Sequence, residues 1–488
     1  MRTGLICKLL GLLLMIFSLS YICPVGVSLL YQDGKVPVFL YAFLLTFSGG
    51  ALLWIPNARR AGELRVRDGF MLTVLFWFVL GLASALPFLL SAAPAMSITD
   101  AVFESISGLT TTGATVLSGL DSLPKSLLFY RQLLQWMGGI GIVVIAVAIL
   151  PLLGVGGMQI YRAQTPGPVK DNKLTPRIAE TAKALAAIYG VLTVACAALY
   201  WLGGMSAFDA IAHAFSTVSI GGFSTHDASM AHFTAQPDIN GDFIIAVCMG
   251  FMVVSGLNFA LHYYCFARRT LGHYARDAET RLYFGLLAVA AVAVSFSLFA
   301  WGTYDAGDGL RHGVFQTVSV MTTTGFTTED FSAWPLHIAF VLIVLSFFGA
   351  CAGSTGGGIK IGRMLILARQ SLREITRLIH PNAVLPVKVD ERPIPPRIAD
   401  AIWGFFGVYL IVFYLMTIVL LATGLDFITA WSAVAATLNN LGPGLGEVGS
   451  NYAGLNAPAK WVLCLSMLLG RLELFTLIVL FVPAYWRS

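Results

Sequence analysis

Charged side chains are scarce in this sequence: Asp, Glu, Lys and Arg together make up 11% of its 488 residues. A soluble globular domain averages about 25% charged residues, so the composition excludes an ordinary soluble domain. The mean hydropathy of +0.80 supports the same conclusion. Nor is any gap between the apolar runs long enough to hold a soluble domain. The chain is therefore predicted to be a polytopic membrane protein.

Motifs that would indicate catalysis or a bound cofactor are also missing. The seven cysteines form no CxxC pair and fall mostly in apolar runs, which favours packing roles, and the eight histidines show no HExxH spacing. Residues 444–449 fit GxGxxG, but no strand–helix unit surrounds them. Ser224, His226 and Asp227 lie close in sequence, whereas catalytic triads assemble in space, so we expect His226 to shape an outer vestibule. No enzyme and no cofactor are predicted.

Ten apolar runs are long enough to be membrane helices, which need roughly 20 residues each. The first continues to Leu30, longer than the apolar core of a signal peptide, so we interpret it as a membrane helix. The runs lie near 5–30, 37–57, 69–91, 127–153, 184–203, 243–266, 282–302, 336–365, 401–423 and 460–486.

Lys and Arg are unevenly distributed over the connections between these runs. If the N-terminus is inside, 24 of the 30 Lys and Arg residues lie on that side and Arg471 belongs to neither side. The five on the outer side are Lys35, Lys125, Arg131, Arg311 and Lys460. Cytoplasmic loops carry such an excess, so both termini are predicted to be cytoplasmic. The net charge of +5 thus reflects topology and requires no nucleic-acid partner.

A short glycine-centred segment recurs four times. Gly113, Gly222, Gly325 and Gly442 are separated by 109, 103 and 117 residues, and each precedes a long apolar run. Each also follows about 12 helix-compatible residues, beginning at Asp100, at Asp209, near His312 and near Thr429. Twelve residues are too few to span a bilayer. After an N-terminal helix pair at 1–60, the chain is therefore divided into four pore repeats at 69–165, 180–272, 281–378 and 398–488.

Four such loops in one membrane chain predict a central pathway. Irregular backbone at membrane depth is tolerated only where protein or a water-filled cavity surrounds it. A ring of backbone carbonyls binds a dehydrated monovalent cation, and helix C-termini pointing at the ring add partial negative charge. Gly and Thr as helix-packing residues would explain one motif but not four. We expect an all-α integral membrane protein of ten transmembrane helices: two N-terminal helices, then four helix–pore loop–helix repeats around a potassium pathway.

The motifs also carry a family resemblance. Thr-Thr-Thr-Gly-Ala-Thr, Ser-Ile-Gly-Gly-Phe-Ser-Thr-His, Thr-Thr-Gly-Phe-Thr-Thr and Asn-Asn-Leu-Gly-Pro-Gly-Leu-Gly resemble the four filters of the bacterial Trk/Ktr/HKT cation transporter superfamily. The length and the two extra helices favour its TrkH/TrkG branch. The resemblance implies potassium uptake across the bacterial inner membrane. It also implies a homodimer with one pore per protomer, and a cytosolic TrkA-type subunit whose nucleotide-binding domains regulate gating.

The resemblance also assigns the potassium-coordinating carbonyls. Because the first filter residue is Gly where sodium-favouring relatives often carry Ser, potassium is favoured. The second and fourth loops depart from Thr-Thr-Gly, so the filter cannot be strictly four-fold. The implied filter residues are Thr111, Thr112, Gly113, Ile220, Gly221, Gly222, Thr323, Thr324, Gly325, Asn440, Leu441 and Gly442.

A glycine-rich stretch at 349–358 predicts a break in the second helix of the third repeat. Five of its ten residues are Gly, each costing about 1 kcal/mol relative to Ala in a helix. Close packing against a neighbouring helix is one interpretation. The other, which the resemblance supports, is a gating loop across the pore, positioned by the charge of Lys360. The implied gating residues are Gly349, Gly353, Gly356, Gly357, Gly358, Lys360 and Arg471.

Arg471 lies 11 residues into the last predicted helix, about 16 Å along it and near the bilayer centre. A charge there costs at least about 2.5–3.5 kcal/mol and usually faces a cavity. Glu473 lies on another helix face, so it is not an expected partner. The matching family position carries an Arg proposed as an electrostatic barrier. A structural pairing with a pore-helix C-terminus or an acidic residue is the alternative.

Several alternatives stay open at this point. An integral-membrane enzyme acting on lipid substrates would leave the four repeats unexplained, and a non-conducting regulatory subunit would leave the intact glycines unexplained. Transport by a channel-like route and by symport with protons or sodium are both compatible with the sequence. The basic stretch 360–397 is a docking surface either for the regulatory subunit or for anionic membrane lipids.

Overall fold

The computed structural model describes residues 2–60, 62, 65–148, 178–390 and 392–486. Within these residues the regular secondary structure is helical apart from one antiparallel pair of two-residue strands, β1 (Lys388–Val389) and β2 (Arg392–Pro393). The prediction of an all-α membrane protein is confirmed. The end of the first predicted repeat and the basic residues from Arg162 to Arg177 lie outside the described residues.

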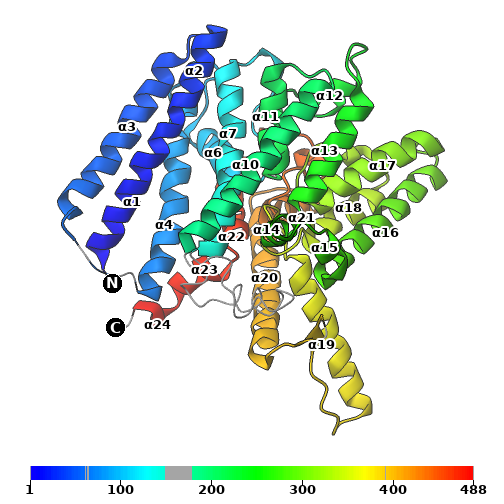
Figure 1. Cartoon of the computed structure of the whole chain (residues 1–488). Helices are drawn as coiled ribbons and strands as arrows, with labels where there is room; N and C mark the ends of the chain where they lie inside the picture. Colours follow the sequence, from blue (N-terminus) through cyan, green and yellow to red (C-terminus); the bar gives the residue numbers. More distant parts are fainter. Residues whose placement is uncertain (1, 61, 63–64, 149–177, 391, 487–488) are drawn as a thin grey trace.

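The N-terminal helices form a pair at one edge of the molecule (Figure 1). The first is one apolar rod, Thr3–Tyr31, with a short 3-10 turn near its middle. The elements are α1 (Thr3–Ser18), η1 (Leu19–Tyr21), α2 (Ile22–Tyr31), α3 (Val36–Trp54) and η2 (Ile55–Asn57).

The next two segments each contain a long helix, a short helix and then further helices. Their boundaries as repeats stay a prediction. The first holds α4 (Val66–Ser84), α5 (Leu86–Leu90), α6 (Ile98–Leu109), η3 (Leu120–Ser122) and α7 (Lys125–Ala148). The second holds α10 (Ile178–Leu202), α11 (Ala207–Val218), α12 (Ala231–Thr234), α13 (Gly241–Ser255), α14 (Phe259–Arg268) and α15 (Gly272–Arg276).

The last two segments follow the same order. The third contains α16 (Ala278–Ala300), α17 (Ala306–Met321), η5 (Phe331–Ala333), α18 (Leu336–Phe348) and α19 (Ile361–Ile379). The fourth contains α20 (Pro396–Ala422), α21 (Phe427–Leu438), η6 (Gly446–Val448), α22 (Ala457–Arg471), α23 (Phe475–Ile478), η7 (Val479–Phe481) and α24 (Pro483–Trp486). The start of α1, the start of α4 and α24 lie together at the same end of the molecule as the projecting helix α19 (Figure 1).

Among the described residues, six helices are long and apolar enough to cross a membrane. Two further predicted spans are bent rather than continuous: α13 and α14 meet at 96°, and α22 and α23 meet at 107°. The first bend occurs where Asn258 starts a new helix by accepting a hydrogen bond from the backbone of Ala260. The second occurs where Glu473 and Leu474 adopt left-handed φ values of 56° and 46°. The predicted break after Phe348 is present, and the helix resumes at Ile361.

The four short helices α6, α11, α17 and α21 are alike at both ends. Each ends four residues before its loop glycine. Each begins at a residue whose side chain accepts backbone N–H groups of the first turn, which stabilises a helix start by about 1 kcal/mol. The third therefore starts at Ala306, earlier than the predicted position near His312. The capping residues are Ser97, Ser206, Asp305 and Asp426.

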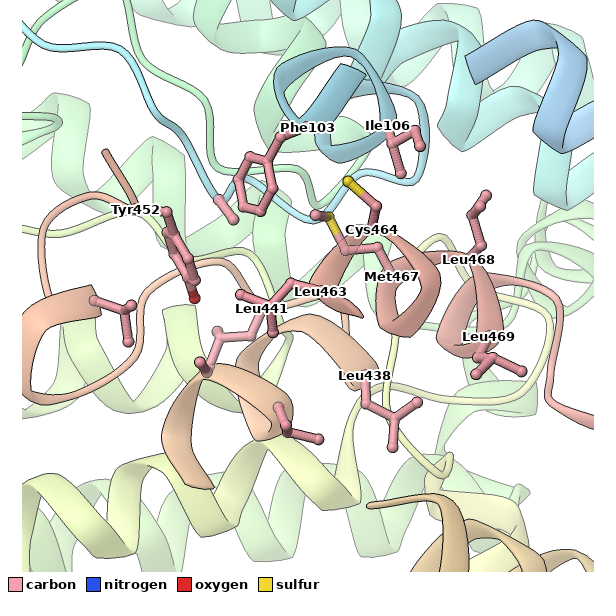
Figure 2. Close-up of a cluster of buried hydrophobic side chains, with 14 of the residues drawn as sticks. Phe103, Ile106, Leu438, Leu441, Tyr452, Leu463, Cys464, Met467, Leu468 and Leu469 are labelled. Atoms are coloured by element: carbon pink, nitrogen blue, oxygen red, sulfur yellow. The ribbon is translucent and has the colours of Figure 1, made fainter. Parts of the chain in front are cut away.

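The first and fourth segments pack against each other, which closes the arrangement. Phe103 and Ile106 of α6 face Cys464 and Met467 of α22 in one buried apolar cluster, with Leu441 of the fourth loop beside them (Figure 2). The four short helices consequently surround a common centre instead of forming a row.

Candidate functional site

The four glycine loops share one backbone conformation. In each loop, the residue two positions before the glycine and the glycine itself both have positive φ, a region that residues other than Gly rarely occupy. The φ values are 53° and 82° for Thr111 and Gly113, 56° and 78° for Ile220 and Gly222, 68° and 84° for Thr323 and Gly325, and 54° and 98° for Asn440 and Gly442.

These loops form a closed ring in which each glycine faces the backbone of the next loop. A Cβ atom placed on any of them would collide with a carbonyl oxygen of the neighbour, so only Gly fits. The Cβ-to-oxygen distances would be 2.3 Å from Gly113 to Gly221, 2.0 Å from Gly222 to Thr324, 2.1 Å from Gly325 to Leu441 and 2.7 Å from Gly442 to Thr112. The order first, second, third, fourth, first shows that the loops enclose one axis.

The first and third loops are held by their own threonines. Thr110 and Thr112 share a hydroxyl–hydroxyl hydrogen bond of 2.7 Å, and Thr322 and Thr324 share one of 2.8 Å. The first hydroxyl of each pair also contacts a carbonyl oxygen of its short helix. The first and third loops are thus stabilised by hydrogen bonds within the loop and to its own short helix.

The second and fourth loops lack this threonine pair and are held from outside. The Gln135 side chain of α7 donates to the Gly221 carbonyl oxygen at 2.5 Å and accepts from the Phe223 N–H at 3.1 Å. The Tyr452 hydroxyl donates to the Gly442 carbonyl oxygen at 2.6 Å. The two loops whose sequences depart from Thr-Thr-Gly are therefore the two that are stabilised by side chains from outside the loop. Sequence reasoning missed Gln135 and Tyr452 because no motif marks them.

A buried ion pair supports the first and second loops. Arg131 Nε lies 2.7 Å from a Glu104 carboxylate oxygen, and the two side chains are 1% and 0% exposed. Arg131 also donates to the Ser224 carbonyl oxygen at 3.0 Å, and Glu104 accepts the Val116 N–H at 3.0 Å. From the sequence, Arg131 was counted only among the outer cations. Its role depends on a contact across 27 positions of the chain.

The glycine-rich stretch crosses directly beneath the ring. The Gly357 N–H donates to the Thr323 hydroxyl at 2.7 Å, and the Gly358 N–H donates to the Asn439 carbonyl oxygen at 3.1 Å. The Thr355 hydroxyl donates to the Val218 carbonyl oxygen at 3.1 Å. A Cβ on Gly357 would lie 1.9 Å from the Asn439 oxygen, so the close approach requires glycine there. The stretch is thus docked onto three of the four short-helix C-termini.

Arg471 joins this stretch to two other helices. Its side chain is 3% exposed and donates to the Thr355 carbonyl oxygen at 2.9 Å and to the Gly138 carbonyl oxygen of α7 at 3.1 Å. Glu473 instead pairs with Arg363 of α19, in agreement with the expectation that it is not the partner of Arg471. Lys360 Nζ donates to the Gly356 carbonyl oxygen, within the same stretch.

A second anchor of the stretch, Glu279, was not recognised from the sequence. One of its carboxylate oxygens accepts the Ala352 N–H at 2.6 Å and the Gly362 N–H at 2.9 Å, so a single side chain holds both arms of the loop. Glu279 is 4% exposed and stands in the first turn of α16.

A cavity borders the stretch and reaches Asn440 of the fourth loop. Its lining includes backbone of Gly356–358 together with Lys360, Arg363, Arg471 and Glu473. The cavity therefore brings part of the ring, the glycine-rich stretch and the cationic side chains of Lys360, Arg363 and Arg471 into one space.

These features define a class: helical membrane proteins in which four short helices present glycine loops to one common centre. Comparison with known sequences identifies the family. The TrkH family, described as cation transport proteins, matches residues 35–488, and the chain belongs to this family.

Several relatives match over the whole chain. The chain is 53% identical over 488 residues to the Trk system potassium uptake protein TrkH of Halomonas elongata, covering 100% of both. It is 52% identical to the Escherichia coli protein of that name and 41% identical to the Trk system potassium uptake protein TrkG of Escherichia coli, covering at least 97% of each chain. The crystal structure of the potassium transporter TrkH from Vibrio parahaemolyticus superimposes with a TM-score of 0.92, at 49% identity and with both chains covered completely. These names denote transport and not a catalysed reaction.

Proposed function

We propose that this chain mediates potassium uptake across a bacterial inner membrane, with the ring of four loops as its selectivity filter. The proposal is supported by the names of relatives that are 52–53% identical over 99–100% of the chain. The single observation that carries the site assignment is the closed contact order of Gly113, Gly222, Gly325 and Gly442. Backbone carbonyls around one axis can replace the hydration shell of a monovalent cation.

The coordinating oxygens are the loop carbonyls predicted from the sequence. Gly221 and Gly442 each accept a side-chain hydrogen bond as well. A carbonyl oxygen has two lone pairs, so it can accept this bond and still coordinate an ion. The C-termini of α6, α11, α17 and α21 point their partial negative charge at the ring, which stabilises a cation without an ionised side chain.

The glycine-rich stretch with Lys360 and Arg471 acts as the gate. Its hydrogen bonds to Thr323, Asn439 and Val218 support a position across the inner face of the ring. Arg471 holds the stretch closed through its hydrogen bond to Thr355. It also brings a positive charge to the pathway, so Arg471 acts both as a structural contact and as an electrostatic barrier. Opening requires these contacts to break together.

Regulation falls to a cytosolic TrkA-type nucleotide-binding subunit acting on a homodimer. Both termini and α19 would then lie in the cytoplasm. The basic stretch 360–397 is the proposed docking surface, because α19 joins it directly to the gate at Ile361. Anionic lipid is the competing occupant.

Arg373 and Arg377 lie beyond the gate contacts and test the docking surface. If the regulatory subunit binds there, replacing both with Gln should abolish its effect on uptake. If anionic lipid binds there instead, the effect of the subunit should remain.

The decisive test is growth and rubidium uptake in cells without their own potassium-uptake systems, with and without the partner and in competition with sodium. Partner-dependent rescue that survives excess sodium supports the proposal. No rescue despite normal membrane abundance refutes it. Gly442→Ala should abolish uptake or reduce its selectivity for potassium over sodium, because Gly442 has φ +98° and its Cβ would lie 2.7 Å from the Thr112 oxygen. The matched control Gly454→Ala has no atom within 4 Å of its Cβ and should behave as wild type.

A further inference from the structure

A cluster of metal-ligating side chains lies beside the second loop, outside the ring. Asp121 comes from η3, which follows the first loop, His232 comes from α12, and His226 stands four residues after Gly222. One ligand atom from each residue lies within 4.8 Å of the other two. Three separate segments therefore bring their side chains to one point.

The cluster has an ordered geometry. The His226 and His232 rings stack with centroids 3.5 Å apart and planes 6° apart. His226 Nδ1 contacts the Asp121 carboxylate, while His226 Nε2 has no hydrogen-bond partner and lies 3.4 Å from an Asp209 carboxylate oxygen. The His226 side chain is 16% exposed and Asp121 is 53% exposed, so the group is supported on one side and open to solution on the other.

Neighbouring contacts hold the segments in place before any ligand arrives. The Leu120 N–H donates to an Asp227 carboxylate oxygen at 2.9 Å, which joins the residues next to Asp121 and His226. The Gln236 amide lies 2.6 Å from His232 Nε2 and restrains that ring. The segments are thus fixed, and one of the two parallel rings must turn for both to direct a nitrogen lone pair at a single ion.

The donor set selects a particular chemistry. Two imidazole nitrogens and one carboxylate oxygen suit Zn²⁺ and similar divalent ions such as Ni²⁺, whereas hard monovalent cations prefer oxygen ligands alone. Three protein ligands leave a fourth position for water. The site is therefore chemically distinct from the carbonyl ring.

We propose that Asp121, His226 and His232 bind one divalent transition-metal ion from the outer solution, and that the bound ion lowers cation entry into the ring. The second half rests on the proposed function. The link to the loop is short. The backbone N–H of His226 donates to the Ser224 hydroxyl at 3.1 Å, and this hydroxyl lies 2.9 Å from the His213 ring of α11. A fixed divalent charge at the mouth repels an approaching cation and restrains this loop.

Binding is tested first, without any transport measurement. The purified full-length protein, carrying no histidine tag, is titrated with ZnCl₂ at neutral pH by calorimetry, alongside His232→Ala, Asp121→Asn and the control His337→Ala. His337 is exposed on α18, and its ring packs at a tilt against Trp301, a residue outside the cluster. Wild type and control should bind one Zn²⁺. Each ligand variant should bind at least about 10–100-fold more weakly, because loss of an outer-shell partner alone has that effect. Absence of binding to the wild type, or equal binding by all four proteins, would overturn the site.

Transport is tested second, as rubidium uptake by cells with ZnCl₂ added outside. Uptake by wild type and His337→Ala should fall as the site fills, and uptake by His232→Ala and Asp121→Asn should not. Zinc binding without any change in wild-type uptake would overturn the effect on entry. A chain that transports no rubidium at all refutes the proposed function instead, and the calorimetric result stands apart from it.

Discussion

Replacing Glu279 should release the gate. Its carboxylate holds the Ala352 N–H on one arm of the glycine-rich stretch and the Gly362 N–H on the other, at 2.6 Å and 2.9 Å. Glu279→Ala leaves both donors buried without this acceptor. Glu279→Gln keeps an oxygen of the same reach, so it is the matched control for side-chain size and hydrogen bonding.

The magnitude follows from the two lost bonds. Leaving a buried donor unsatisfied costs about 1–3 kcal/mol, so Glu279→Ala removes about 2–6 kcal/mol from the docked arrangement of the stretch. Since about 1.4 kcal/mol changes an equilibrium tenfold, the open population should rise by at least about tenfold if the closed gate is the ground state. Glu279→Gln should lose only a small part of this.

Rubidium uptake in cells without other potassium-uptake systems measures the effect, in the absence of the regulatory partner and at equal membrane abundance. Glu279→Ala should raise partner-independent uptake, and Glu279→Gln should stay near wild type. Size-exclusion profiles in detergent show whether the Ala variant still folds. A well-folded Glu279→Ala protein with wild-type uptake would refute the role of these two bonds in gating.

Three further substitutions, at two residues, test the contacts on either side of the ring. Arg471→Ala should raise ion flux and weaken regulation because it removes the bonds to Thr355 and Gly138; unchanged flux at equal expression contradicts this. Arg471→Lys separates charge from geometry, since Lys keeps the charge but cannot reproduce the guanidinium fork. Glu104→Gln should lower the thermal midpoint in detergent, because breaking a buried ion pair costs about 3–5 kcal/mol and Arg131 would stay buried. An unchanged midpoint would show that the pair is not needed for stability.

The glycines of the ring were predictable because each satisfies two requirements at once, one of its own backbone and one of the neighbouring loop. A positive φ and a backbone oxygen within van der Waals distance both exclude a side chain, so the residue type itself records the geometry. The break after Phe348 was predictable for the same reason, since five glycines in ten residues oppose a helix. The use of these features for potassium selection and gating stays a proposal.

The helix bends at 256–258 and 472–474 have no comparable signal in the sequence. Both lie in apolar runs whose hydropathy is that of a continuous span. Glu473 and Leu474 take left-handed φ values although neither residue favours them, while Glu473 pairs with Arg363, more than one hundred positions earlier. A tertiary contact of this kind outweighs local helical preference and is invisible to periodicity.

The class of protein and the number of loops could therefore be predicted from hydropathy and glycine spacing, because apolar length and positive φ are properties of short segments. The partners of those loops were not. Gln135, Tyr452, Glu279 and the Asp121–His226–His232 cluster acquire meaning only when segments distant in the chain meet. Hydrogen bonds and ligand sets depend on distances between side chains, and those distances exist only after the helices have packed around the common axis.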